Sequence, residues 1–478
     1  MKQQRFALIC LVLMIVFQSF TVEKVQATVD DQTSKDWPQG PKVYAEAAIV
    51  MEASTGLILY EKNIHETYYP ASITKILSAL IAIENSSMGE IVTFSRDAIF
   101  KVDLDSSRIG IDVGEQLTMQ QCLYSILLES ANEVTYATAE HIGGSIEGFA
   151  QMMNERAKSV GALNSNFVNP HGLHDDNHKT TAYDMALITR EAIKNETFRK
   201  IFNTRTYKIP PTNIQPETRY LANHHRFVLK QDYFYDDCIG GKTGYTSKAR
   251  YTLVTVAKRG DLELITVIMK DDSYDHQYQD TIKLLDYGFD NFSIYPIAEL
   301  EKSNRIVESP MFTRYNALLS ESNSPIVTDE NGYLVLPNTA SFEDAEKQVS
   351  FYDSSEIKMM EGKNVIGRIS YTYQDKYVGG ANIIYNNIKT PTLNLILPEL
   401  DSPASNNGNG DPMEDSIHKP KGSSLRPIII SVTIGVLVLF VGLYFVLVER
   451  PRLKRRNAYY RKRALRRRMY QEDDFLDL

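Results

Sequence analysis

The chain has 478 residues, so we expect more than one domain, because single cores rarely grow past roughly 250 to 300 residues. Hydrophobic residues make up 43% of the sequence and charged residues 23%, which excludes a wholly disordered protein. The net charge of −8 combines two basic ends with an acidic body, and such a body lacks the clustered Lys and Arg side chains that nucleic-acid binding needs.

The N-terminal residues 1–27 have the pattern of a secretion signal. Lys2 and Arg5 give a positive start, and residues 6–20 are almost continuously apolar. Residues 25–27 then place small side chains where a signal peptidase cleaves. The alternative is an N-terminal membrane anchor, but the apolar run is shorter than the about 20 residues that a transmembrane helix needs. We therefore expect this segment to be removed on export.

The next region alternates between strand and helix patterns. Residues 43–63 predict a β-hairpin, because two alternating runs flank a Ser-Thr-Gly turn. Apolar residues then recur at helical spacing, and two further strand patterns precede a closing helix. The predicted helices are 72–84, most of 115–160, 182–194 and 274–290, and the two strands are 251–257 and 262–269. Early and late strands can share one antiparallel sheet with packed helices, so residues 40–296 predict an α+β domain.

The pattern changes after residue 296. Residues 297–398 contain short apolar runs between many turns and predict a small all-β domain, and residues 399–426 have the Ser, Asn, Gly and Pro content of a flexible linker. Residues 427–448 predict a transmembrane helix, because the run 428–448 holds no charged residue and is long enough for a hydrocarbon core of about 30 Å. A buried core helix is the alternative, but the strongly basic residues 449–478 that follow are typical of the cytoplasmic side of a membrane span. We expect a single-pass membrane protein with an extracytoplasmic body and a cytoplasmic C-terminus.

Two cysteines, Cys122 and Cys238, remain after removal of the signal. Two residues cannot form a disulfide framework, and no Cys-x-x-Cys or His/Cys cluster indicates zinc. Whether the two pair is open at this stage, and buried free thiols are the preferred expectation.

Three short motifs occur in one order along the chain. They are Ser72-Ile73-Thr74-Lys75, Ser130-Ala131-Asn132 and Lys242-Thr243-Gly244. Taken singly, each has a structural interpretation: a helix N-cap, a helix-to-loop junction and a strand. Their combination, order and wide spacing favour a catalytic site.

Each motif offers a chemical group in a suitable place. Ser72 falls in the first turn of a predicted helix, near unpaired backbone N–H groups, and Lys75 lies on the same helix face. Burial and a second cation such as Lys242 would lower the pKa of Lys75, so that its neutral amine could take the proton of Ser72 during attack on a carbonyl. Ser130 could relay a proton to a leaving nitrogen, and Asn132 could hold a substrate amide.

The Gly241–Gly244 segment invites comparison with a phosphate-binding loop. That loop needs glycine at position 236, which is Asp236 here, and it needs a following helix rather than the predicted strand. An edge strand carrying Lys242 and Thr243 instead suits a peptide that ends in a carboxylate.

The three motifs resemble those of the penicillin-recognising serine enzymes. Within that group, the chain is similar to the low-molecular-weight penicillin-binding proteins that act as serine-type D-alanyl-D-alanine carboxypeptidases. Further matches to that family are residues 70–75, 169–173, 181–185 and 242–246, and the resemblance covers roughly residues 40–398. It implies a serine DD-peptidase/β-lactamase-like fold with a helical subdomain beside the sheet.

The resemblance also implies site roles and partners. Ser72 would form an acyl-enzyme with the peptidoglycan stem pentapeptide and release the terminal D-alanine, with Lys75 as general base and Ser130 as proton relay. Asn132 would bind the substrate amide, Lys242 and Thr243 the terminal carboxylate, and the backbone N–H groups of Ser72 and Tyr245 the oxyanion, beside Gly244. β-Lactam antibiotics would bind covalently, and no cofactor or metal is expected.

The alternatives are a β-lactamase or a catalytically silent wall-binding scaffold. A β-lactamase with these motifs uses a glutamate after the second motif for deacylation, and residues 165–169 contain no acid. Against the scaffold, all motif residues are intact. The motifs do not separate removal of the terminal residue from cleavage of crosslinks. The group His171, His174 and His178 lacks metalloprotease spacing, so we interpret it as a polar loop.

Overall fold

The computed structural model describes residues 36–229, 233–303, 326–352 and 362–387. Four predicted segments lie outside the described residues: the signal (1–27), the linker (399–426), the transmembrane helix (427–448) and the cytoplasmic tail (449–478). Among the described helices, none combines the length and the apolar composition that a membrane span requires.

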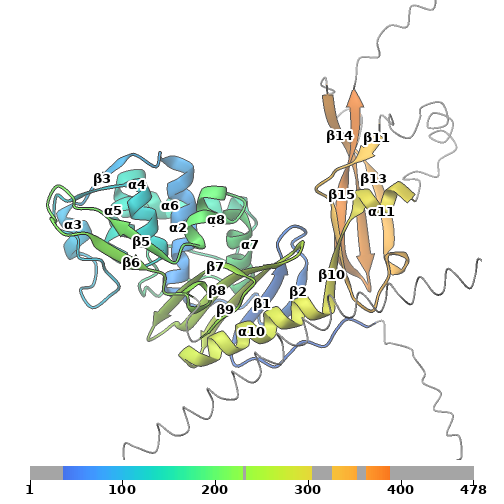
Figure 1. Cartoon of the computed structure of the whole chain (residues 1–478), viewed down its shortest axis with the longest axis horizontal. Coiled ribbons are helices and arrows are strands. Elements are labelled where there is room, and N and C mark those ends of the chain that lie inside the picture. Colours follow the sequence, from blue (N-terminus) through green and yellow to red (C-terminus); the bar gives the residue numbers. More distant parts are fainter. Residues whose placement is uncertain (1–35, 230–232, 304–325, 353–361, 388–478) are drawn as a thin grey trace, which may run out of the picture. The chain divides into compact units, whose positions relative to one another are not determined.

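A five-stranded antiparallel sheet forms the centre of the first part of the chain, residues 36–291 (Figure 1). Its strands, in spatial order, are β2 (Ile58–Lys62), β1 (Ala47–Glu52), β9 (Leu262–Asp271), β8 (Arg250–Arg259) and β7 (Cys238–Thr246). The predicted hairpin is therefore confirmed as β1–β2, and the two predicted later strands are β8 and β9. The strand β7, which carries the third motif, lies at one edge.

Alternation along the strands places apolar side chains on both faces of this sheet. On β1, Ile49 and Met51 join one core, whereas Ala48 and Val50 join a second core on the opposite face. Successive strand residues point to opposite faces, so a strand that is buried on both sides needs apolar residues at consecutive positions, as β1 has at residues 47–51.

Helices cover the two faces of the sheet, with α10 along one face and a group of helices on the other (Figure 1). The helices are α2 (Lys75–Asn85), α3 (Arg96–Phe100), α4 (Met119–Leu127), α5 (Asn132–Gly143), α6 (Ile146–Ser159), α7 (Ala182–Ala192), α8 (Glu196–Phe202), α9 (Arg226–Leu229) and α10 (Tyr274–Asn291). The predicted helical region 115–160 is confirmed as α4, α5 and α6. The chain begins α4 with a capping box of Thr118 and Gln121, which satisfies two backbone N–H groups.

Two short hairpins accompany the helical group. They are β3 (Ile91–Thr93) with β4 (Gln116–Thr118), and β5 (Thr206–Ile209) with β6 (Arg219–Ala222). A buried ion pair joins them, because Arg219 Nη1 lies 2.6 Å from Oε1 of the fully buried Glu115.

The second part of the chain contains a six-stranded sheet. Its main strand order is β10-β12-β15-β14-β13, and β11 pairs with β15. The elements are β10 (Phe292–Pro296), α11 (Ile297–Ser303), β11 (Ile326–Thr328), β12 (Tyr333–Pro337), η3 (Phe342–Asp344), β13 (Glu346–Phe351), β14 (Gly362–Tyr373) and β15 (Lys376–Asn387). Two features differ from the sequence-based expectation: the helix α11 occurs where only strands were expected, and β10, just before the expected boundary, pairs with β12 of this sheet.

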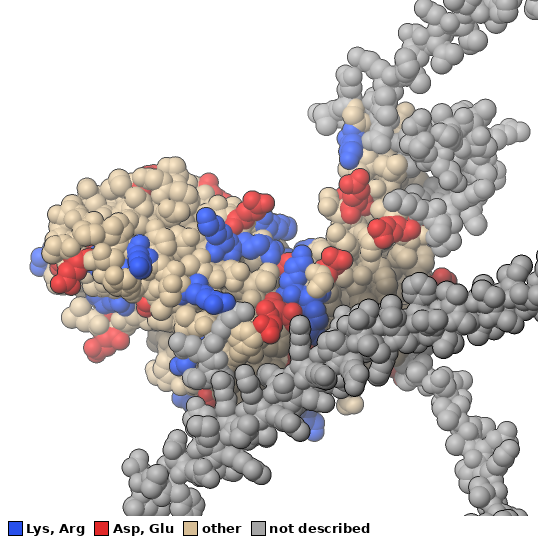
Figure 2. Space-filling model, viewed as in Figure 1, with Lys and Arg blue, Asp and Glu red and all other residues tan. Residues whose placement is uncertain are grey.

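Charged side chains of both signs are interspersed on the face shown in Figure 2. The two cysteines are reduced thiols. Cys122 is buried as expected, whereas Cys238, the first residue of β7, is only half-buried.

Candidate active site

The segment that carries Ser72 is a short 3₁₀ helix, η1 (Ala71–Thr74), which leads directly into α2. Ala71 has a φ of 51°, an uncommon conformation for a residue with a side chain. Two contacts hold it: Thr252 Oγ1 donates to the Pro70 carbonyl at 2.9 Å, and Gly172 packs so closely that a Cβ there would lie 1.8 Å from the Ala71 oxygen. The predicted helix 72–84 therefore starts with a tight turn that leaves Ser72 half-buried at its surface.

Lys75 is fully buried, and its Nζ atom has three oxygen neighbours. Its Nζ lies 2.9 Å from Ser72 Oγ, 2.6 Å from Asn132 Oδ1 and 2.7 Å from the His171 carbonyl oxygen. The first two motifs thus meet at one nitrogen atom.

Burial lowers the pKa of Lys75 well below its ordinary value, and the positive charge of Lys242 lowers this pKa further. The Glu133 carboxylate acts in the opposite direction on the same pKa. The expectation that Lys242 serves as the second cation is therefore supported, and a neutral amine at Lys75 can accept a proton from Ser72.

The second motif forms a tight corner between α4 and α5. Ser130 has a φ of 59° and is 3% exposed, and its Oγ has no hydrogen-bond partner among the described residues. Asn132 begins α5, and its backbone N–H donates to the Ser107 carbonyl at 2.8 Å. A buried hydroxyl without a partner lowers the stability of a fold, so the Ser130 hydroxyl is a candidate for a functional role.

The third motif lies on the edge strand β7, directly against η1. A Cβ on Gly244 would lie 2.8 Å from the Ser72 nitrogen and 2.4 Å from Thr252 Oγ1, so only glycine allows this approach. Lys242 is 1% exposed, and burial lowers its pKa to about 7. Tyr245 is 52% exposed and packs on Tyr251, with ring centroids 4.7 Å apart.

A cleft of about 590 Å³ joins the three motifs. Six of the predicted site residues line it: Ser72, Ser130, Asn132, Thr243, Gly244 and Tyr245. Lys75 and Lys242 are buried and do not line the cleft. The structure therefore brings all eight predicted residues to one place, six at the cleft surface and two amines buried beside it.

Comparison with known proteins agrees with this geometry. The profile of the peptidase S11 family, D-alanyl-D-alanine carboxypeptidase, matches residues 32–273. The D-alanyl-D-alanine carboxypeptidase DacF of Bacillus subtilis is 30% identical over 67% of this chain and 80% of its own length. The carboxypeptidase DacA of Escherichia coli is 27% identical over 74% of this chain and 85% of its own length.

The chain belongs to the serine-type D-alanyl-D-alanine carboxypeptidase family. Solved structures support the fold. Penicillin binding protein 5 from Haemophilus influenzae covers 73% of this chain and 98% of its own, with a TM-score of 0.57 at 24% identity. The Streptomyces K15 DD-transpeptidase covers 53% of this chain and 100% of its own, with a TM-score of 0.50 at 27% identity.

In this carboxypeptidase, further residues line the cleft that the motifs did not reveal. Among them are Arg226 on α9, Tyr251 on β8, and Tyr274 and Gln277 on α10. Arg226 Nε donates to Tyr274 Oη at 2.7 Å, and Gln277 is 1% exposed with an Oε1 that lacks a partner among the described residues. No sequence motif marks them, because they come from three elements that meet only in the folded protein.

The histidine loop of the carboxypeptidase is structural. His171 and His178 are buried, and burial lowers the pKa of His178 to about 4. The His178 Nε2 atom lies 3.0 Å from Thr74 Oγ1, which ties the loop to η1.

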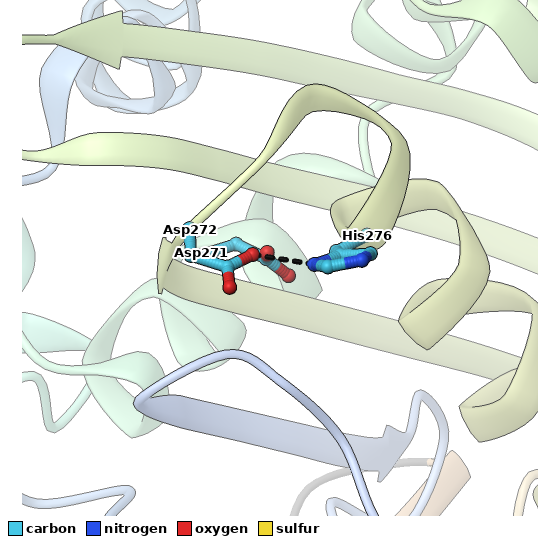
Figure 3. Close-up of side chains that lie close together, drawn as sticks. All are labelled: Asp271, Asp272 and His276. Carbon is cyan, nitrogen blue, oxygen red and sulfur yellow. Dashed lines mark hydrogen bonds and ion pairs between the residues drawn. The ribbon is translucent and has the colours of Figure 1, made fainter.

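A different group of possible metal ligands, Asp271, Asp272 and His276, lies at the end of β9 and the start of α10 (Figure 3). The dashed line in Figure 3 joins His276 Nδ1 to Asp272 Oδ1 at 2.5 Å, and the His276 ring stacks on Tyr44. Burial raises the pKa of Asp271 to about 7. The group therefore consists of a hydrogen-bonded Asp272–His276 pair beside the buried Asp271.

Proposed function

We propose that Ser72 is the nucleophile that forms an acyl-enzyme with the D-Ala-D-Ala end of a peptidoglycan stem peptide. The observation that carries this proposal is the 2.9 Å contact between Ser72 Oγ and the fully buried Lys75 Nζ. As the hydroxyl attacks the penultimate carbonyl, its proton passes to the neutral Lys75 amine. The C–N bond then breaks, the terminal D-alanine leaves, and water later hydrolyses the ester on Ser72.

The leaving nitrogen needs a proton, and we assign its delivery to Ser130. Support comes from the buried Ser130 Oγ, which lines the cleft and has no partner among the described residues. Asn132 holds the substrate amide through its side-chain Nδ2 group, because its Oδ1 already accepts from Lys75 Nζ.

The oxyanion is assigned to the backbone N–H groups of Ser72 and Tyr245. The close approach of Gly244 to the Ser72 nitrogen supports this assignment, because it brings β7 beside the start of η1.

The terminal carboxylate is assigned to Lys242 and Thr243, together with Arg226. Lys242 is buried with a lowered pKa, so its positive charge is not permanent at neutral pH. Arg226 is the one Lys or Arg side chain among the described residues that line the cleft, and a guanidinium stays charged.

The same nucleophile is expected to react with penicillin, whose strained amide takes the place of the peptide bond. The measurement that tests the proposed reaction is release of D-alanine from a stem pentapeptide by the purified protein. Wild type should release one D-alanine, Ser72→Ala none, and the control Ser125→Ala, which alters a buried serine on α4 that does not line the cleft, should match wild type. Undiminished release by Ser72→Ala would refute the assignment.

The two alternatives predict other results with labelled penicillin. A scaffold would form no covalent adduct, and a β-lactamase would form one that turns over rapidly. A long-lived adduct together with release of D-alanine is expected here.

We also propose that the catalytic body is exported and held at the outer surface of the cell membrane. This rests on the sequence alone: the apolar residues 427–448, the basic residues 449–478 and the N-terminal signal. The basic tail would lie in the cytoplasm, near anionic lipid headgroups.

A further inference from the structure

Glu133 is a buried acid next to the second motif that the proposed reaction does not use. It lies in the first turn of α5, directly after Asn132, and is 0% exposed. Burial raises the pKa of its carboxyl group, although backbone N–H groups of the loop before β4 lower it. Burying an acid is costly, and one of its oxygens, Oε2, has no partner among the described residues.

The other oxygen of Glu133 fastens a loop. Oε1 accepts hydrogen bonds from the backbone N–H groups of Ile109 at 2.7 Å and Gly110 at 3.2 Å. One residue earlier, the Asn132 N–H donates to the Ser107 carbonyl at 2.8 Å. Three hydrogen bonds therefore tie residues 107–110 to two consecutive residues of α5.

This loop is part of the cleft. Asp105, Ser106 and Ser107 line it, and Ser107 is the first of the residues tied to α5. Asn132, the other end of the connection, contacts Lys75 Nζ at 2.6 Å. Glu133 thus lies where one wall of the cleft is joined to the residue that contacts the general base.

We propose that Glu133 is a positioning residue for acylation: its carboxylate holds residues 107–110 on α5 and thereby fixes both the loop wall of the cleft and Asn132. The inference rests on the proposed acylation of Ser72. The physical reason is the length of the Glu133 side chain, because its Oε1 has to accept hydrogen bonds from two backbone N–H groups at once. Without this acceptor, the partly buried N–H groups of Ile109 and Gly110 lose their shared partner, and the loop moves to find another.

Three variants separate reach, charge and stability. Glu133→Gln keeps the side-chain length and an acceptor oxygen but removes the charge. Glu133→Asp keeps the charge but withdraws the acceptor by one methylene. The matched control is Glu52→Asp, because Glu52 is also 0% exposed and also accepts loop N–H groups, from Ser54 at 2.9 Å and Thr55 at 2.7 Å, outside the cleft.

The readouts are the second-order rate of acylation by fluorescent penicillin and the thermal midpoint of each full-length variant. We expect Glu133→Asp to acylate at least about tenfold more slowly, since small misplacements of reacting groups have large rate effects. Glu133→Gln should acylate within about threefold of wild type, and Glu52→Asp should lose thermal stability without losing rate.

An acylation rate of Glu133→Asp equal to that of wild type would overturn the inference. So would a Glu52→Asp variant whose acylation rate and thermal midpoint both fall as much as those of Glu133→Asp. A slow Glu133→Gln beside a normal Glu133→Asp would also overturn it, because charge rather than reach would then matter. Absence of any adduct in wild type would instead refute the proposed nucleophile, so the two failures are distinguishable.

Discussion

Lys75 and Lys242 are two buried amines within electrostatic reach of each other, and their proton affinities decide when the site can react. Burial disfavours the charged form of both groups, and the charge of Lys242 further disfavours protonation of Lys75. For Lys75 the result is a pKa well below its ordinary value, which favours the neutral amine that a base needs. For Lys242 it is a cation that titrates near pH 7.

Replacement of Lys75 by arginine tests the need for a neutral amine. Arginine fills a similar volume but keeps its proton, so Lys75→Arg should slow acylation by penicillin by about 10²–10⁴-fold. The control is Lys62→Arg, since Lys62 Nζ donates to the carbonyl oxygens of Val43 and Ala45, away from the cleft. A Lys75→Arg rate within tenfold of wild type would show that Lys75 is not the base.

The pH dependence of kcat/KM for a pentapeptide should have two limbs. The acid limb rises as Lys75 loses its proton. The alkaline limb falls from about pH 7, because Lys242 is protonated below its pKa of about 7 and loses the charge that attracts the carboxylate above it. Lys242→Arg should remove this alkaline limb, since a guanidinium stays charged. An unchanged alkaline limb in Lys242→Arg would assign it to another group.

At the scale of elements, the site depends on how closely β7 approaches η1. The closest point is Gly244, where any Cβ meets the Ser72 nitrogen and Thr252 Oγ1. Gly244→Ala should therefore displace β7 and slow acylation by about 10²-fold or more, comparable to loss of one oxyanion donor.

The control for this substitution is Gly89→Ala. A Cβ added at Gly89 would meet no atom within 4 Å, and Gly89 has no positive φ. The acylation rate of Gly89→Ala should therefore equal that of wild type. A fully active Gly244→Ala would mean that β7 does not take part in oxyanion binding. The measurement for both variants is the second-order rate of labelling by fluorescent penicillin.

Elements with a strong hydrophobic period could be predicted from the sequence. The hairpin β1–β2, the helices α4 to α6, and the strands β8 and β9 follow from local alternation and capping alone. The three motifs could be assigned to one site because of their combination, order and wide spacing, although each alone has a structural interpretation.

Features that depend on distant contacts could not be predicted. Ala71 and Ser130 adopt positive φ angles, and no local pattern shows this. Their surroundings come from distant parts of the chain: Gly172 and Thr252 pack at Ala71 and Pro70, and the Asn132 N–H beside Ser130 donates to Ser107. The helix α11 and the pairing of β10 with β12 likewise depend on the second sheet as a whole. Arg226 and Glu133 reach the site through tertiary contacts, so a sequence pattern does not distinguish them from surface charges.

For the whole molecule, the proposed topology predicts where the activity is found after cell fractionation. The full-length chain should sediment with membranes, because a 427–448 span anchors it, and a chain ending at residue 400 should be released in active form. Extraction with high salt should not release the full-length chain. Salt screens charge–charge interactions and so releases proteins that are bound only electrostatically, but it does not weaken the burial of an apolar span. Release by salt alone would contradict a transmembrane anchor, and sedimentation of the shortened chain would place the membrane contact elsewhere.

The central claim concerns one atom, the Ser72 oxygen. The most direct measurement is mass-spectrometric mapping of the adduct formed when the full-length protein reacts with benzylpenicillin. One penicilloyl group per chain, located on Ser72, is the predicted result. An adduct on any other residue, or an unmodified Ser72 in a protein that still releases D-alanine, would contradict the account.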